Sequence, residues 1–172
     1  PTLHLSPMVG DVEQILRALN SAKVRYLVVG GVAVVLHGHL RTTKDLDLVL
    51  QLEPENVRRA MAALASLGYL PVAPVPAEDF SDPAIRASWI REKNLTVFSL
   101  WRDASPAVDL FVEEPFDFDA VYARSVRTPL RRTFTQVVAV QDLIAMKRQA
   151  NRTQDHADIE ALSSLEERES SS

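Results

Sequence analysis

The sequence predicts a single α/β domain with a mixed β-sheet, on three observations. The chain has 172 residues, the size of one domain. Apolar segments with helical spacing alternate along it with short apolar runs that are typical of strands. Two strand-like segments, residues 95–101 and 107–112, are joined by a tight turn, so at least one strand pair is antiparallel. A sheet that combines such a pair with intervening helices is mixed rather than purely parallel.

The first half of the chain alternates helices and strands. Val12, Ile15, Leu16 and Leu19 recur at helical spacing and give one apolar stripe. A glycine pair separates the first strand from the short helix that follows it, and Gly68 closes the last helix of this half. The predicted elements are a helix at 11–23, a strand at 26–29, a short helix at 32–36, a strand at 45–50 and a helix at 54–67.

The second half begins with a proline-rich segment at 71–83, predicted to be a loop with a short strand at its start. The elements predicted after it are a helix at 83–92, the strand pair, a helix at 116–125, a strand at 134–140 and two closing helices at 141–150 and 154–165. The tail, residues 166–172, is polar and serine-rich, which predicts disorder. We therefore expect one domain over residues 1–165.

Composition excludes several classes of protein. Hydrophobic residues make up 47% and charged residues 24% of the chain, a globular balance without a candidate membrane span. Cysteine is absent, which excludes disulfides and thiolate sites. The start of the chain has no signal-peptide pattern, so we expect a cytoplasmic protein. The net charge of −4 argues against nucleic-acid binding by the whole chain.

A local basic patch is still compatible with that net charge. Arg124, Arg127, Arg131 and Arg132 are its best candidates. The alternative is that these side chains line a solvated strand edge.

Asp45 and Asp47 are the first candidates for a metal site. They lie two residues apart on a predicted strand, so both carboxylates point to one face while Leu46 and Leu48 point to the other. Neighbouring carboxylates repel each other unless a cation lies between them. A hard divalent ion suits such oxygen ligands, and Mg²⁺ fits best if triphosphate oxygens complete its shell. The alternative is a pair of acids on a solvated strand edge.

Gly30 and Gly31 end the preceding strand and lead into a helix. Glycine has no Cβ to obstruct a ligand, and a helix N-terminus offers unpaired N–H groups, so this corner suits a phosphate. A simple tight turn is the alternative. Arg41 and Lys44, on the loop before the acids, could contact phosphate or could instead pair with Asp45.

Asp109 is a third acid within an apolar strand, where aspartate is disfavoured. If that strand neighbours residues 45–50, three carboxylates converge. Such a site would serve two-metal phosphoryl chemistry, in which one metal holds the triphosphate and the other activates an attacking hydroxyl. Asp109 could then also accept the proton. An acid on a solvated strand face is the alternative.

These residues resemble the first motif of the nucleotidyltransferase (polymerase-beta-like) superfamily. That motif is an apolar strand with two small residues, then a spacer, then Asp-apolar-Asp-apolar; here these are residues 26–31, 32–44 and 45–48. Asp109 matches the third acid of the family. The segments 142–150 and 152–158 are similar to the last two motifs of the abortive-infection (AbiEii), type IV toxin-like minimal nucleotidyltransferases. The resemblance covers residues 26–162 and implies a nucleotidyltransferase fold with a C-terminal helical hairpin.

The resemblance also implies roles for individual residues. The triphosphate would be held at Gly30 and Gly31, with Lys147 reaching its phosphates. The three acids would bind two Mg²⁺ ions, with Asp109 as the base. The supporting residues of the helical motif are Arg152, Asp155 and Asp158. The residues alone also allow a helical hairpin joined by ion pairs, with Arg148 and Arg152 as the partners of the two acids.

Two positions depart from the family pattern. Gln154 stands where this branch has lysine in an Arg-x-Lys-Asp motif. A basic residue expected before the third acid is not clearly placed, and Lys93 and Arg102 are the only candidates. Both departures remove positive charge that could neutralise a triphosphate.

The predicted function is Mg²⁺-dependent transfer of a nucleoside monophosphate from a nucleoside triphosphate (NTP) to a hydroxyl acceptor. The resemblance suggests RNA, such as a tRNA 3′ end, or a protein side chain as acceptor, with a toxin or antitoxin partner. One alternative is a small-molecule (antibiotic) nucleotidyltransferase, which needs a second pocket wall that this short chain would have to obtain by dimerising. Another is a non-catalytic nucleotide- or partner-binding domain, which Gln154 favours.

Overall fold

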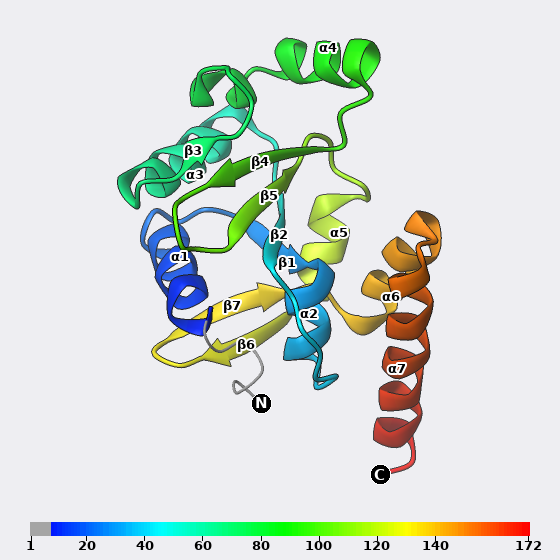
Figure 1. Ribbon diagram of the computed structural model, residues 1–172. Coiled ribbons are helices and arrows are strands. Elements are labelled where there is room, and N and C mark those ends of the chain that lie inside the picture. The colour runs from blue at the N-terminus through cyan, green and yellow to red at the C-terminus, as the bar shows by residue number, and fades with distance from the viewer. Residues whose placement is uncertain (1–7) are drawn as a thin grey trace.

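The computed structural model describes residues 8–172; residues 1–7, and the judgement on a signal peptide that depends on them, lie outside the described part. One β-sheet runs through the fold, with helices on both sides (Figure 1). On one side lie α1 (Val9–Ser21) and α3 (Pro54–Ser66), and on the other lie α2 (Gly30–Leu36), α5 (Phe118–Ala123), α6 (Val140–Ala150) and α7 (Thr153–Ser170).

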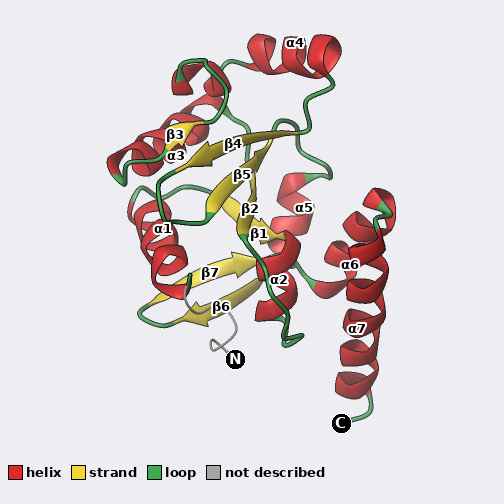
Figure 2. Ribbon diagram, viewed as in Figure 1, coloured by secondary structure: helices red, strands yellow, loops and turns green. Residues whose placement is uncertain are grey.

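The sheet has seven strands in the order β3-β4-β5-β2-β1-β7-β6 and is mixed, as predicted (Figure 2). Parallel pairing joins β2 to β5 and β1 to β7, and the other neighbours are antiparallel. The strands are β1 (Tyr26–Val29), β2 (Asp45–Leu50), β3 (Leu70–Pro71), β4 (Val97–Trp101), β5 (Ala107–Phe111), β6 (Val126–Leu130) and β7 (Thr133–Val137).

The core forms where the central strands meet the helices. All four residues of β1 are buried, which is why this strand reads as a continuous apolar run. β2 and β5 instead alternate, with Leu46, Leu48, Val108 and Leu110 fully buried between half-buried acids. Alternation along these two strands therefore predicts correctly which side chains leave the core. No helix among residues 8–172 has the length and apolar character needed to cross a membrane.

The strand β6 was not predicted. It is an edge strand in which only Leu130 is buried, so it lacks the apolar alternation that marks a half-buried strand. It contains Pro129, which has no backbone N–H to donate. An edge position tolerates this because an edge strand has no neighbour on its outer side. A turn through Arg131, with a φ of 52°, joins it to β7.

The segment between α3 and β4 is more ordered than its prolines suggest. A 3-10 helix, η2 (Ala77–Ser81), precedes α4 (Pro83–Lys93). Asp82 caps α4 by accepting hydrogen bonds from the backbone N–H groups of Ala84 and Ile85. The predicted helix at 83–92 is thereby confirmed.

The predicted disorder of the C-terminal tail is wrong for residues 166–170, because α7 continues to Ser170. Glutamate and arginine are good helix formers, so a helix can extend past its last buried residue without needing a partner surface. Serine hydroxyls also donate to backbone carbonyls one turn earlier, as Ser171 does to Glu167.

Candidate functional site

The two acid motifs lie side by side in the sheet. β2 and β5 are parallel neighbours, and their register pairs Asp47 with Asp109. Leu46 pairs with Val108 in the same register, and both are fully buried. Asp45 lies two residues before Asp47 and so shares its face. The three carboxylates therefore occupy one sheet face across two adjacent strands, and the expected adjacency of the two strands is confirmed.

Asp47 is the most strongly perturbed of these acids. The pKa of its carboxyl is raised from 3.8 to about 7, first by burial and then by the negative charges of Asp109 and Asp45. Burial and the charge of Asp109 also raise the pKa of Asp45, while Lys44 opposes this shift. The site therefore resists the accumulation of negative charge and favours a cation or a proton.

Ser99 joins the acids at this face and was missed as a site residue. It lies opposite Asp109 across the antiparallel β4–β5 pair, and its hydroxyl donates to Asp109 Oδ1 at 2.6 Å. Its position between the buried residues Phe98 and Leu100 was a usable signal, because it places Ser99 on the face opposite the core. The hydrogen bond fixes one oxygen of Asp109 and leaves the other available.

Gly30 and Gly31 bring the backbone directly against the acid strand. Gly30 has a φ of +66°, and a Cβ at this position would overlap the Asp47 carboxylate. A Cβ at Gly31 would lie 2.5 Å from Thr43 Oγ1 and 3.0 Å from Arg41 Nη2. Both positions therefore require glycine on steric grounds before any ligand is considered.

Arg41 connects the loop before β2 to the C-terminal helix. Its Nη2 donates to Asp158 Oδ2 at 3.0 Å, and its Nε lies 2.9 Å from Oδ1 without the alignment for a hydrogen bond. Of the two options that the sequence left open, the structure does not show pairing with Asp45, and contact with phosphate stays a prediction. Arg41 pairs with an acid 117 positions further along the chain.

Lys147 is buried between the two acids of α7. Its Nζ lies 2.8 Å from Asp158 Oδ2 and 3.4 Å from Asp155 Oδ1, and its side chain is only 5% exposed. Burial opposes ionisation of Asp158, but the hydrogen bond and charge of Lys147 and the charge of Arg41 outweigh it and lower the pKa of this carboxyl. The α6–α7 hairpin is thus held by a buried charge network, as the structural alternative proposed.

Arg152 lies where this hairpin faces the acids of the sheet. It forms a capping box with Asp155, and its Nε donates to Asp155 Oδ2 at 2.8 Å. The positive charges of Arg152 and Lys147 both lower the pKa of Asp47, against the larger effect of burial. The helical motif therefore lies within electrostatic reach of the metal-site candidates. Arg148 is exposed and has no ion-pair partner among the described residues, contrary to its expected pairing.

The departures from the family pattern have local explanations. Gln154 donates from Nε2 to Asp158 Oδ1 at 3.1 Å, so it takes part in the same network without adding a charge. Arg102 binds Asp11 and the Leu67 carbonyl oxygen and packs over Tyr69, which ties β4 to α1. Lys93 is exposed at the end of α4. Neither cation is seen to contact the acid face.

Within residues 8–172, no three His, Asp or Glu side chains are gathered closely enough to form a metal site. The predicted three-carboxylate ligand set therefore stays a prediction. The donor chemistry fits Mg²⁺, since Asp45, Asp47 and Asp109 provide hard oxygen atoms on one face. The pKa values of Asp45 and Asp47 are raised by burial and by the neighbouring negative charges, which a bound cation would neutralise.

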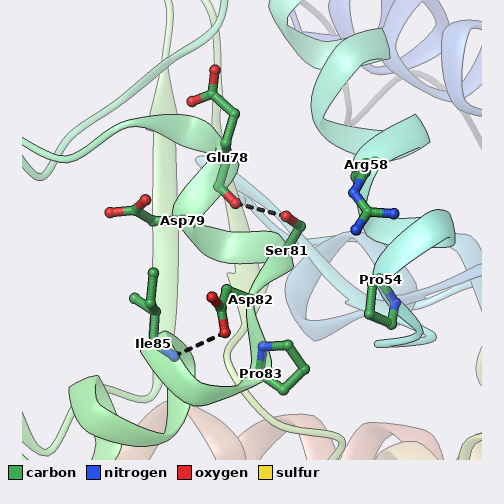
Figure 3. Close-up of a pocket in the computed structure, with 8 residues that line it drawn as sticks. All are labelled: Pro54, Arg58, Glu78, Asp79, Ser81, Asp82, Pro83 and Ile85. Carbon is green, nitrogen blue, oxygen red and sulfur yellow. Dashed lines mark hydrogen bonds between the residues drawn. The ribbon is translucent and has the colours of Figure 1, made fainter.

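A cavity of about 400 Å³ lies elsewhere, between the start of α3 and the η2–α4 segment (Figure 3). It is found beyond the C-terminal end of β2, whereas the acids lie near the beginning of that strand. Arg58 and three acids are among the residues that line it, and none of the predicted site residues does. The lining residues are Pro54, Arg58, Glu78, Asp79, Ser81, Asp82, Pro83 and Ile85.

Solved structures with a similar fold are nucleotidyltransferases. The lincomycin-bound lincosamide antibiotic adenylyltransferase LnuA matches with a TM-score of 0.62 and 17% identity, over 91% of this chain and 96% of that one. ANT(2″)-Ia in complex with adenylyl-2″-tobramycin matches with a TM-score of 0.57 and 13% identity, over 90% and 86%. A putative nucleotidyltransferase from Thermotoga maritima matches with a TM-score of 0.57 and 13% identity, over 88% and 89%. No curated protein sequence matches the chain.

The family assignment comes from the sequence as a whole. A family described as "Nucleotidyltransferase of unknown function (DUF6036)" matches residues 4–168, nearly the full length. The similar solved structures agree with this assignment, but at 13–17% sequence identity they support the fold alone. The resemblance to the AbiEii, toxin-like branch is not supported by these matches. The chain belongs to the nucleotidyltransferase family DUF6036.

Proposed function

We propose that this protein is a Mg²⁺-dependent enzyme that transfers a nucleoside monophosphate from an NTP to a hydroxyl acceptor. One observation carries the proposal: the register of β2 and β5 pairs Asp47 with Asp109 and puts Asp45 on the same face, in a chain of the nucleotidyltransferase family. A solvated strand edge would not be expected to raise the pKa of an acid to about 7.

Asp45, Asp47 and Asp109 are the residues that would hold Mg²⁺. The ion, when bound, would neutralise triphosphate charge and polarise the reacting phosphate. Two ions could be shared by the three carboxylates, with Asp47 between Asp45 and Asp109. Binding of a cation would also remove the repulsion that raises the pKa of Asp47.

The remaining positive groups divide between exposed and buried positions. Lys44 is exposed beside the acids, and Arg152 is largely exposed there although it also pairs with Asp155. We assign to both of them contact with the triphosphate, together with the backbone at Gly30 and Gly31. Lys147 and Arg41 are committed to the carboxylates of α7. We assign to Lys147 and Arg41 the positioning of the hairpin against the acid face, in place of the direct phosphate contacts that the sequence suggested.

Asp109 is the proposed base. Ser99 holds its Oδ1, so the other oxygen is available to take the proton of an acceptor hydroxyl. The acceptor oxygen then bonds to the α-phosphorus, the bond from that phosphorus to the bridging oxygen breaks, and pyrophosphate leaves with the electron pair. The acceptor is proposed to be RNA or a protein side chain, in a toxin–antitoxin or defence setting, on the resemblance of residues 142–158 alone.

A small-molecule acceptor is the second candidate. Two of the similar structures contain an antibiotic or its adenylylated product, and the lincomycin-bound protein aligns over 91% of this chain and 96% of its own. A chain of comparable length can therefore present a small-molecule site in this fold. This weakens the expectation that the present chain is too short for such an acceptor.

The test is incubation with Mg²⁺ and each α-³²P-labelled NTP in turn, in the presence of total RNA, cell extract or an aminoglycoside and lincosamide panel. Label on one acceptor class identifies the acceptor. The matched control is the Asp45→Asn/Asp47→Asn double variant, which keeps side-chain size. Absence of label on every acceptor, or label that persists in the control, would contradict the catalytic proposal. Calorimetric titration of NTP with Mg²⁺ would then distinguish a non-catalytic nucleotide binder from a protein that binds no nucleotide.

A further inference from the structure

The β6–β7 hairpin carries a concentration of positive charge in an otherwise acidic chain. Residues 120–141 contain four arginines and no aspartate or glutamate, whereas the whole chain has a net charge of −4. Arg124 pairs with Asp142 on α6. Arg127, Arg131 and Arg132 are exposed and have no ion-pair partner within residues 8–172. Three cations without an ion pair therefore remain on this hairpin, where the Glu13 carboxylate of α1 accepts a hydrogen bond from the backbone N–H of Arg132 at 2.8 Å.

An exposed aromatic ring accompanies these charges. The register pairs Pro129 with Phe134 and Arg127 with Gln136, so these four side chains share the outer face of the hairpin. Phe134 is 47% exposed, and the Arg127 guanidinium carbon lies 4.2 Å from the centroid of its ring. An exposed arginine stacked on an exposed ring forms a flat, positively charged platform.

This platform lies on the same face of the sheet as the acids. Val28 pairs with Leu48 in β2 and with Val137 in β7, so these three residues share the face opposite Asp47. Phe134 and Gln136 alternate with Val137 and therefore share the face of Asp47. Two strand spacings of about 4.8 Å and about four residues along β7 put the ring on the order of 15 Å from Asp47.

We propose that this platform, formed by Arg127 and Phe134 and flanked in the adjoining turn by Arg131 and Arg132, binds single-stranded RNA and guides its end to the acid site. Of the two turn residues, Arg131 directs its guanidinium toward Gly10 of α1. Guanidinium planes and aromatic rings stack on unpaired bases, and arginines bind phosphates. A span of about 15 Å corresponds to about five stacked nucleotides at ~3.4 Å each. RNA fits better than an anionic membrane, because a stacked ring and guanidinium offer a surface for bases but little area for insertion into lipid. The role as acceptor rests on the proposed function, whereas binding does not.

The test is fluorescence anisotropy with a 5′-labelled, unstructured 12-nucleotide RNA, in EDTA and without NTP. We expect binding at 50 mM NaCl that weakens with salt. The Arg127→Gln/Arg131→Gln/Arg132→Gln variant should bind at least tenfold more weakly, with a slope of log K against log salt shallower by about 2. Phe134→Leu keeps an apolar side chain but cannot stack, and should weaken binding about tenfold.

The matched control is Arg58→Gln/Arg91→Gln/Arg168→Gln, which removes the same charge from other exposed surfaces and should bind RNA like the wild type. Circular dichroism and thermal melting check that each variant is folded. No RNA binding by the wild type, an equal loss in the control, or equal or tighter binding of the matching DNA strand or of phosphatidylserine vesicles would overturn the inference.

The proposed function can fail separately. The Asp45→Asn/Asp47→Asn variant should keep the wild-type affinity for the RNA while losing transfer. RNA binding without label transfer to any acceptor counts against the catalytic proposal alone. Transfer to another acceptor without RNA binding counts against the platform alone.

Discussion

Arg41 and Asp158, 117 positions apart in the chain, form a partly buried ion pair in which Arg41 Nη2 lies 3.0 Å from Asp158 Oδ2. The pair joins the loop that precedes the acid strand to the C-terminal helix. Lys147 reaches the same carboxylate oxygen at 2.8 Å. One fully buried carboxylate therefore links both halves of the candidate site, and its removal should affect folding as well as any activity.

Asp158→Asn should destabilise the protein by about 3–5 kcal/mol, because it leaves the charges of Lys147 and Arg41 without their shared partner. Urea unfolding at pH 7 measures this. Glu160→Gln is the control, since Glu160 is exposed on the same helix and should change stability by less than about 0.5 kcal/mol. Similar effects of the two substitutions would show that the network does not stabilise the fold.

Asp47→Asn should stabilise the protein at pH 8 in EDTA, although it removes a proposed metal ligand. The pKa of Asp47 is raised from 3.8 to about 7. The penalty for its ionisation is absent below about pH 4, grows as the pH rises to about 7, and is constant above. At 1.36 kcal/mol per pH unit it amounts to at most about 4 kcal/mol.

The difference in the free energy of unfolding between the wild type and Asp47→Asn isolates this effect from the titration of other groups. Chemical unfolding of both proteins from pH 4 to pH 8 measures this difference. A difference that does not change with pH contradicts the assignment. Addition of 5 mM Mg²⁺ at pH 8 should raise the melting temperature of the wild type more than that of the variant. Equal shifts would argue against Asp47 as a ligand.

Gly30→Ala should be more damaging than Gly38→Ala. Both glycines have positive φ, +66° and +111°, so both substitutions strain the backbone by about 1–3 kcal/mol. Only at Gly30 would the new methyl group overlap the Asp47 carboxylate, since a Cβ at Gly38 has no heavy atom within 4 Å among the described residues. Thermal melting and nucleotide titration of the two variants measure how much more stability and nucleotide affinity Gly30→Ala loses than Gly38→Ala. Equal losses at the two positions would leave only the backbone conformation to explain the glycine pair.

Ser99→Ala should lower kcat about tenfold with little change in the KM for NTP, because it frees the Asp109 carboxylate without removing it. Ser88→Ala is the control: it also removes a serine hydrogen bond, to the Ile85 carbonyl oxygen on α4, away from the acids. Ser99→Thr keeps the hydroxyl and should recover part of the rate. A change in KM alone would place Ser99 in binding rather than in the positioning of Asp109.

Local patterns in the sequence were sufficient for much of this protein. Alternation along residues 45–50 and 107–111 decided which side chains leave the core, because side chains on a strand point to opposite faces in turn. Apolar residues at helical spacing and glycines at helix ends marked the α1, α2 and α3 regions, because both signals depend only on residues close together in the chain. The mixed sheet followed from these signals, and the nucleotidyltransferase family followed from the resemblance of residues 26–48 to the first motif of that superfamily; both are confirmed.

Contacts between distant segments were decided only by the tertiary structure. Strand order and register are long-range, so nothing local pairs Asp47 with Asp109, places Ser99 on Asp109, or brings Arg41 to Asp158 rather than to Asp45. The edge strand β6 and the helical tail lack buried partners, and burial is what leaves a periodic signal. Sequence alone thus supplied the acids and their faces, whereas folding decided which charges meet them.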